Sequence, residues 1–200
     1  QTTAAPDKRG LLAINQAYKD FDDAGLSVIA ISSEEPDVVK KFVNGLKEQM
    51  AFSIAADRRD GTKRAWLDAA GIQQTPTAFI VDRKGKLAWI GNAANEEEAL
   101  QFLYVLTRVI DGRFDPKLER QARPGIQGAE NARKVKNWRM ANKYFDDVIT
   151  LDPSVFADVA LDKFEMLAVD MNDKTAAYAF AKTLITEKFA SDSGALMMLA

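Results

Sequence analysis

The stretch that decides the fold is Thr75-Pro76-Thr77-Ala78-Phe79-Ile80-Val81-Asp82-Arg83-Lys84-Gly85-Lys86-Leu87-Ala88-Trp89-Ile90-Gly91. Two apolar runs within it, residues 77–81 and 87–90, have the β-branched and aromatic content that is typical of strands. The polar residues between them end in Gly85, which suits a hairpin with a left-handed bulge residue. The stretch therefore predicts an antiparallel hairpin that the chain enters through a Thr-Pro step.

Upstream of this stretch, helical and strand periods alternate. Residues 26–31 (LSVIAI) are almost continuously apolar, which predicts a strand buried on both faces, as in a parallel sheet. The remaining predicted elements are helices over 10–23, 35–48, 60–70 and 96–110 and a short strand over 52–55. This order predicts a layered α/β domain that ends near Phe114.

After Pro116 the period changes, and no further strand is predicted. Residues 116–125 are expected to form a short helical or linker segment that Pro124-Gly125 breaks. The helical segments predicted beyond it lie near 126–137, 139–151, 154–170, 173–188 and 193–199. The predicted organisation is thus an α/β domain over 1–115, a linker over 116–125 and an all-α domain over 126–200.

The second half carries a weak internal repeat. Ala141, Phe145 and Pro153 fall at the spacings of the small, aromatic and closing-proline positions of a tetratricopeptide (TPR) unit. One repeat period later, Ala177 and Ile185 correspond to Ala141 and Ile149. The pattern predicts TPR-like helical hairpins, with a generic helical bundle as the alternative.

The composition excludes several kinds of chemistry. The 200 residues contain no cysteine and no histidine, so they hold no disulfide, thiolate nucleophile, imidazole ligand or Ser-His-Asp triad. The net charge of −2, with both signs interspersed, lacks the basic excess of a nucleic-acid binder. The apolar stretches are too short for a membrane span. We expect no cofactor, no metal site, no nucleic-acid partner and no membrane span.

The quoted stretch and three shorter pieces resemble the TlpA/redoxin branch of the thiol-disulfide oxidoreductases, which have a thioredoxin fold. The shorter pieces are residues 26–34, residues 38–43 and Ala65-Trp66. Some members of the branch also carry a TPR-like C-terminal extension, so the resemblance covers most of the chain. It implies an α/β thioredoxin-like domain followed by an all-α TPR-like domain.

The resemblance also implies a peptide-binding groove. In the family the proline at Pro76 is cis and faces the redox cysteines, and the backbone at Thr75 pairs with an extended substrate peptide. Trp66 is expected in the core or in the wall of this groove. The candidate peptide-binding residues are therefore Thr75, Pro76 and Trp66.

This sequence differs from the family at the catalytic motif. Family members have Cys-x-x-Cys and a basic residue at the start of the first long helix, and this motif falls on Ala4-Ala5-Pro6-Asp7, followed by Lys8. Ala4 stands at the attacking position and Asp7 at the resolving one. Because exchange requires a thiolate, the 200 residues cannot perform it. Asp7 is expected to act as a helix cap or first-turn carboxylate.

A second departure concerns the sheet. In the family a central strand precedes the motif and lies between the strands at 26–31 and 77–81, and no such strand precedes Ala4 in this sequence. Three explanations stay open: a segment upstream of Gln1, a strand from another chain, or a rearranged sheet. We favour the first, because a central strand satisfies two ladders of backbone groups.

Three hypotheses for function follow. The first is a redox-inactive protein that binds peptide segments or a protein partner through the groove beside Pro76 and through the C-terminal helices. The second is a TlpA-like oxidoreductase whose active-site cysteines are replaced in this chain or lie outside these residues. The third is a purely structural scaffold. Family resemblance alone implies a periplasmic or cell-envelope location, and it leaves a homodimer open.

Overall fold

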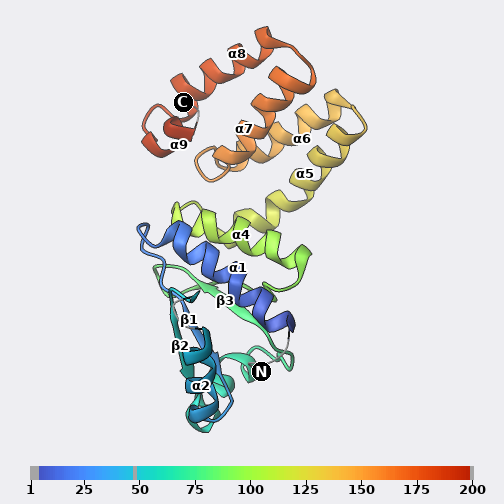
Figure 1. The fold of residues 1–200 in the computed structure, drawn as a ribbon. Helices are drawn as coiled ribbons and strands as arrows, with labels where there is room; N and C mark the ends of the chain where they lie inside the picture. The colour runs from blue at the N-terminus through green and yellow to red at the C-terminus, as the bar shows by residue number, and fades with distance from the viewer. Residues whose placement is uncertain (1–4, 47–48, 199–200) are drawn as a thin grey trace. The chain divides into compact units, whose positions relative to one another are not determined.

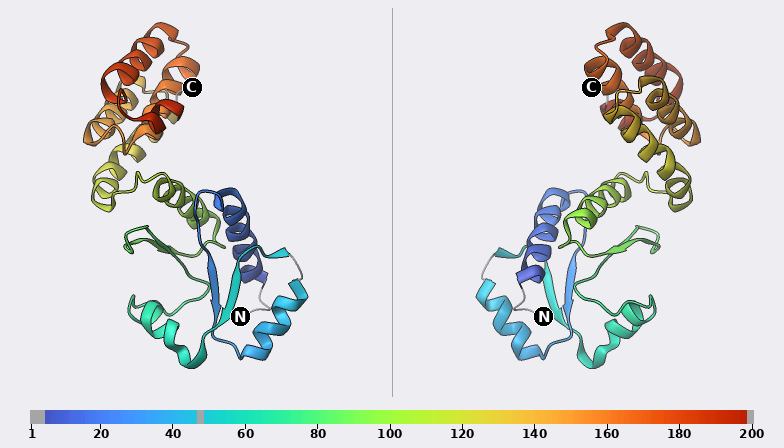
Figure 2. Two further views of the ribbon diagram at one scale, coloured as in Figure 1. Left: turned by 90° about the vertical axis from the view of Figure 1, so that its left-hand side faces the viewer. Right: turned by 90° about the vertical axis from the view of Figure 1, so that its right-hand side faces the viewer.

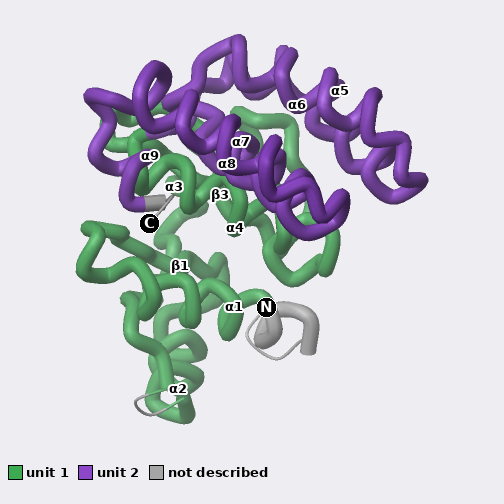
Figure 3. The backbone as a smooth tube through the Cα atoms, turned by 90° about the horizontal axis from the view of Figure 1, so that it is seen from above, with its two compact units in different colours: residues 1–112 green, residues 113–200 purple. Residues whose placement is uncertain are grey.

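The computed structural model describes residues 5–46 and 49–198, and the chain divides into two compact units, residues 1–112 and 113–200 (Figures 1 and 3). Unit 1 contains helices and strands, and the described part of unit 2 contains helices and turns only. The predicted change from α/β to all-α is therefore confirmed. The boundary lies between Gly112 and Arg113, a few residues before the predicted end at 115.

Unit 1 alternates helices and strands in the predicted order. Its elements are α1 (Ala5–Phe21), β1 (Ile29–Ser32), α2 (Pro36–Leu46), β2 (Ser53–Ala56), η2 (Arg58–Asp60), α3 (Gly61–Lys63), η3 (Arg64–Asp68), β3 (Ala78–Val81), β4 (Leu87–Gly91) and α4 (Glu96–Ile110). The side chain of Asn95 caps α4 by accepting from the backbone N–H groups of Glu97 and Glu98. The helix and strand periods and the capping signals in the sequence thus predicted the order of elements in this unit.

The strands form two separate ribbons. β1 pairs in parallel with β2, and β3 pairs with β4 as the predicted antiparallel hairpin, in which Gly85 has a φ of +75°. No described strand joins β1 to β3, so each ribbon keeps an unpaired edge (Figure 2). Ile29 and Ile31 on β1 are 61% and 44% exposed. This is high for a strand whose sequence predicts burial on both faces.

The core of unit 1 lies between the β3–β4 hairpin and the helices α1 and α4. Ile80 and Trp89 pair across the hairpin, and the Trp89 ring packs edge-on against Phe102 of α4 at 5.5 Å between centroids. Ala17 of α1, Ala93 after β4 and Leu106 of α4 complete this buried cluster. The two helices therefore cover one face of the hairpin (Figure 1).

Asn15 ties α1 to the segment that enters β2. It is 5% exposed; its Nδ2 donates to the carbonyl of Gln49 at 3.0 Å, and its Oδ1 accepts from the N–H of Ala51 at 2.7 Å. A buried side-chain amide requires such partners, because an unpaired one would carry a desolvation penalty. Asn15 thereby connects the helix to the β1–β2 ribbon.

The described part of unit 2 consists of consecutive antiparallel helices and two shorter helical turns, η4 and η5. Its elements are α5 (Pro116–Lys134), α6 (Trp138–Leu151), α7 (Ala157–Glu165), η4 (Met166–Asp170), α8 (Lys174–Thr183), η5 (Leu184–Lys188) and α9 (Ser193–Met198). The Asn137 side chain caps α6, and Asp173 caps α8. None of the described helices is long and apolar enough to cross a membrane.

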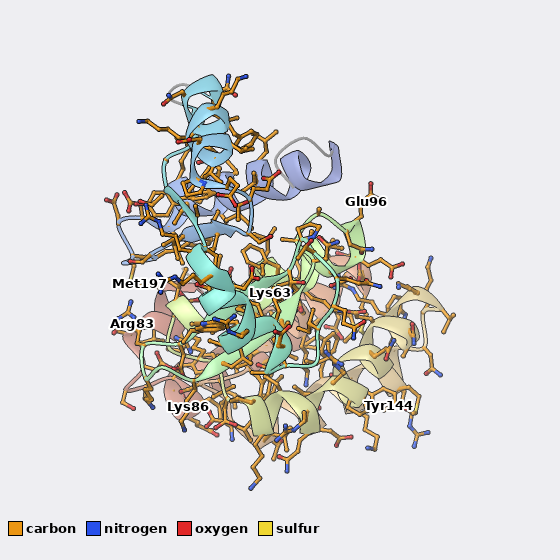
Figure 4. All side chains as sticks on the ribbon, turned by 90° about the horizontal axis from the view of Figure 1, so that it is seen from below. Lys63, Arg83, Lys86, Glu96, Tyr144 and Met197 are labelled. Atoms are coloured by element: carbon orange, nitrogen blue, oxygen red, sulfur yellow. The ribbon has the colours of Figure 1, made fainter. Side chains whose placement is uncertain are left out.

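The predicted linker over 116–125 is wrong, because these residues form the first half of α5. Asp115 caps the helix, and Pro124 lies inside it. A Cβ on Gly125 would lie 2.6 Å from Val148 Cγ2, and one on Gly128 would lie 3.0 Å from the ring of Tyr144 on α6 (Figure 4). The two glycines therefore allow α5 and α6 to pack closely and do not end a helix.

The structure supports only part of the predicted repeat. Ala141 and Ala177 are both buried, at 0% and 1% exposure. Ile149 is buried, but Ile185 is 47% exposed, and its neighbour Leu184 takes the buried position. The TPR-like character of unit 2 stays a prediction.

Arg113 joins three parts of unit 2. Its guanidinium forms a two-point ion pair with Asp192, at 3.1 and 3.2 Å, and also donates to the carbonyl of Ser154. Asp192 also caps α9 by accepting from the N–H of Ala195. The bond from Ala195 and then the one from Arg113 lower the pKa of Asp192 to about 2.

Candidate functional site

The Thr75–Pro76 step lies at one end of the β3–β4 hairpin. Ala78 pairs with Gly91, so this step and the loop that follows β4 lie at the same end. A Cβ built on Gly10 of α1 would lie 3.0 Å from the Cβ of Ala94 in that loop. The start of β3, the loop after β4 and the N-terminal part of α1 therefore meet at this end of unit 1.

The step itself is accessible. Thr75 is exposed, Pro76 is half-buried, and the peptide bond between them is cis. Thr77 closes the turn by donating its hydroxyl to the carbonyl of Gln74 at 2.7 Å. Within the part of the chain that the structure describes, the backbone N–H of Thr75 has no partner. It is therefore free to donate to an added strand.

Trp66 lies against the other face of the hairpin. Phe79 and Ile80 are successive residues on β3 and point to opposite faces, so Phe79 points away from α1 and α4. The Trp66 ring packs edge-on against Phe79 at 5.1 Å and remains 43% exposed. The structure thus brings Trp66 against β3, where it contacts Phe79, three residues from Pro76.

Asp57 positions the helical segment that carries Trp66. Its two carboxylate oxygens accept from the N–H groups of Thr62 at 3.0 Å and Lys63 at 2.9 Å, at the start of α3 (Lys63 is labelled in Figure 4). These two bonds are the main reason that the pKa of Asp57 is lowered from its ordinary value. Sequence reasoning missed this role, because it placed the helix start at Asp60-Gly61-Thr62, whereas the side chain of Asp60 makes no cap bond and Asp57, three residues earlier, accepts from the first turn.

The degenerate motif lies at the start of α1. Ala4 falls outside the described residues, whereas the backbone of Ala5, Pro6 and Asp7 belongs to α1. The backbone of Asp7 is helical, and its expected role as a cap or first-turn carboxylate stays a prediction. None of the four side chains has a thiol, so thiol-disulfide exchange has no nucleophile here. Among the described residues, no three carboxylate side chains gather as a metal site would require.

The comparisons with known proteins bear on unit 1. Residues 5–90 match the AhpC/TSA family. Unit 1 is a redoxin-like domain with a thioredoxin fold. Its relatives include three proteins named thiol-disulfide oxidoreductase ResA. The one from Bacillus thuringiensis (strain Al Hakam) is 33% identical over 89 residues, which are 43% of this chain and 47% of the relative.

The other two relatives match the redoxin-like domain at similar lengths. The protein from Geobacillus thermodenitrificans is 30% identical over 87 residues, covering 43% of this chain and 47% of the relative. The protein from Halalkalibacterium halodurans is 23% identical over 101 residues, covering 50% and 54%. The chain thus spans about half the length of these curated relatives. No solved structure matches the chain.

Proposed function

We propose that the protein is a redox-inactive, thioredoxin-like binding protein whose redoxin-like domain takes an extended peptide segment beside Pro76. The observation that carries the proposal is the pairing of a cysteine-free sequence with an accessible Thr75–Pro76 step. The chemistry of the family is missing from these residues, while the surface that would hold its peptide is retained.

In the proposed binding mode, the extended peptide pairs as an added strand with the backbone at Thr75. Its unpartnered N–H supplies a main-chain hydrogen bond, and main-chain bonds give such complexes affinity with little sequence preference. Trp66 supplies an exposed aromatic surface near the same strand, of the kind that anchors peptide side chains. The C-terminal helices supply a second contact surface, and the cell envelope is the proposed location.

Thr75→Pro tests the groove. The substitution removes the N–H and should abolish the binding of a peptide selected from a random library, measured by calorimetry on the full chain. Gln73→Pro, at an exposed position two residues earlier, serves as the control for the effect of a new proline. Unchanged affinity in a folded Thr75→Pro variant would contradict the proposed site.

A reductase assay tests the loss of chemistry. With insulin as the disulfide substrate and a dithiol as the reductant, the chain should show background turnover only. Dithiol-dependent turnover above background would refute redox inactivity.

The names of the relatives favour a second candidate function, that of a thiol-disulfide oxidoreductase whose cysteines lie elsewhere or have been replaced. The double variant Ala4→Cys and Asp7→Cys tests this candidate and the alignment of the motif together. If the start of α1 retains the environment of a redox site, the variant should gain insulin reductase activity. If it stays at background while folded, neither the alignment nor a replaced active site holds.

A further inference from the structure

An open depression of about 370 Å³ lies at the surface of unit 2, between the helices α6, α7 and α8. It is referred to below as the α6–α8 cavity. The residues of its lining that matter for its chemistry are Trp138, Arg139 and Asn142 on α6, Lys163 on α7, Met171 after η4, and Phe180 on α8. Helices that are adjacent in sequence thus bring together aromatic, thioether, amide and cationic groups.

Lys163 is a cation that is buried in the lining of this cavity. Its side chain is 7% exposed; its Nζ lies 2.6 Å from Asp146 Oδ1 and 4.4 Å from the centroid of the Phe180 ring. An ammonium has three donors, and the described residues supply one acceptor, Asp146, whose side chain is half in solvent. Burying a charge with so few partners is costly. An anionic ligand would complete its surroundings.

Arg139 adds a second cation at the exposed edge of the cavity. The described residues give its guanidinium no ion pair or hydrogen bond. Asn142 lies one helical turn further along α6, and among the described residues its side chain makes one hydrogen bond, a long one to Asp146 at 3.5 Å. A guanidinium and an amide at this spacing can bind one carboxylate together.

The one carboxylate in the lining is already engaged. Asp173 caps α8, and its Oδ1 accepts from the N–H of Ala176 at 2.9 Å. The groups that remain available to a ligand are therefore two cations and an amide, beside the apolar surfaces of Trp138, Met171 and Phe180. This combination fits a ligand with one apolar part and one negative charge.

We propose that the α6–α8 cavity binds a protein segment in which a large apolar side chain stands next to an acidic residue. The apolar side chain lies between Trp138 and Phe180, and the carboxylate binds Arg139 and Asn142 near the Lys163 ammonium. Charge complementarity selects this occupant over a purely apolar segment. The inference rests on the proposed binding function and assigns it a second site, in unit 2.

The test uses a labelled octapeptide with one phenylalanine between two glutamates, titrated into the full chain. Matched peptides carry glutamine in place of the glutamates, or alanine in place of the phenylalanine. We expect saturable binding of the acidic aromatic peptide and at least tenfold weaker binding of both matched peptides. Equal affinity for the glutamine peptide overturns the inference.

Two variants on α6 remove the same charge from different places. Arg139→Gln should weaken binding about tenfold, because it removes a charge-assisted hydrogen bond. Lys143→Gln on the same helix, whose ammonium pairs with Asp147 outside the cavity, should leave binding unchanged. Equal effects of the two variants would mean that only net charge matters, and the inference would fail.

A third variant tests the cavity without changing its charge. Ala176→Phe fills the cavity and should abolish binding, with a circular dichroism spectrum like that of the parent chain. If this variant unfolds, the emission of Trp138 in a Trp66→Phe, Trp89→Phe background replaces it, since peptide bound in the cavity must change that emission.

The variant Thr75→Pro separates the two proposals. If it alone abolishes binding of the octapeptide, the peptide occupies unit 1, and the inference is overturned while the proposed function stands. If Arg139→Gln weakens binding about tenfold, Ala176→Phe abolishes it and Thr75→Pro leaves it unchanged, the second site is established independently of the first.

Discussion

Seventeen buried apolar residues form one cluster in the described part of unit 2, whereas the cluster around α1, α4 and the hairpin in unit 1 contains five. The difference follows from the elements used. Each helix of unit 2 satisfies its own backbone and packs against its sequence neighbours. In unit 1, β1 and β3 each keep an unpaired edge, and Ile29 and Ile31 stay exposed. An all-helical unit can thus complete a core locally, whereas an α/β unit needs a continuous sheet.

Equivalent truncations in the two cores should give the largest effect. Phe156 of unit 2 is 0% exposed and Phe102 of unit 1 is 7% exposed. Phe156→Ala should lower the free energy of unfolding of unit 2 by about 3–5 kcal/mol, and Phe102→Ala should cost unit 1 less, because its smaller cluster can relax. Urea unfolding can follow the units separately, since Trp66 and Trp89 report unit 1 and Trp138 reports unit 2. Equal costs would contradict the comparison.

Alanine substitutions at two glycines should have opposite effects, because Gly125 lies at a close helix contact and Gly45 on an open helix surface. Gly125→Ala should destabilise unit 2 by about 1–3 kcal/mol, because the new Cβ would lie 2.6 Å from Val148. A Cβ added at Gly45 on α2 would have no other atom within 4 Å. Gly45→Ala should therefore stabilise unit 1 by about 0.5–1 kcal/mol, because alanine has the higher helix propensity. Thermal unfolding measures both. A neutral Gly125→Ala would argue against tight α5–α6 packing.

Acid should weaken unit 2 through Asp192. Because the pKa of Asp192 is lowered to about 2 in the folded chain, its stabilisation is present above about pH 4 and is lost as the pH falls through 2. After allowance for solvent screening, the loss should be about 1–2 kcal/mol. Asp192→Asn keeps a cap for Ala195 but loses the Arg113 ion pair, so its unfolding free energy should not show this loss. A pH dependence identical to that of the parent chain would exclude Asp192 as the cause.

Asp162 should produce a smaller effect of opposite sign. Desolvation, followed by the charge of Asp158, raises its pKa to about 6. The folded state therefore binds more protons between about pH 4 and 6, and unit 2 should gain stability as the pH falls through 6. Asp162→Asn should raise stability at pH 7 by up to about 1 kcal/mol, discounted for its exposure, and should remove the gain. If unit 2 instead gains stability from pH 5 to 7 in the parent chain, this account of Asp162 fails.

Sequence periodicity predicted most elements of unit 1, because helix and strand periods and the Asn95 cap are local signals. It did not predict α5. Pro124-Gly125 resembles a break, and only contact with Val148 and Tyr144 shows that the glycines are needed for packing. The Asp115-Pro116 start of this helix was a usable signal.

The candidate sites, too, could be predicted only in part. Family resemblance supplied Thr75, Pro76 and Trp66, and the structure added the approach of Gly10 to Ala94 and the anchoring of α3 by Asp57. The α6–α8 cavity could not be predicted, because Arg139, Lys163 and Phe180 come from three helices and share no sequence pattern. Which helix faces meet depends on how the helices cross, and local periodicity does not encode that.

The split between the two ribbons of unit 1 has a mechanical consequence. Within a ribbon, strands that are pulled along their length must break several ladder hydrogen bonds at once. Between β1 and β3 the described chain offers no such ladder, so a force that separates the ribbons is resisted by side-chain packing and by isolated hydrogen bonds such as those of Asn15. Under load, unit 1 should therefore extend first between its ribbons, at a lower force than is needed to shear either one.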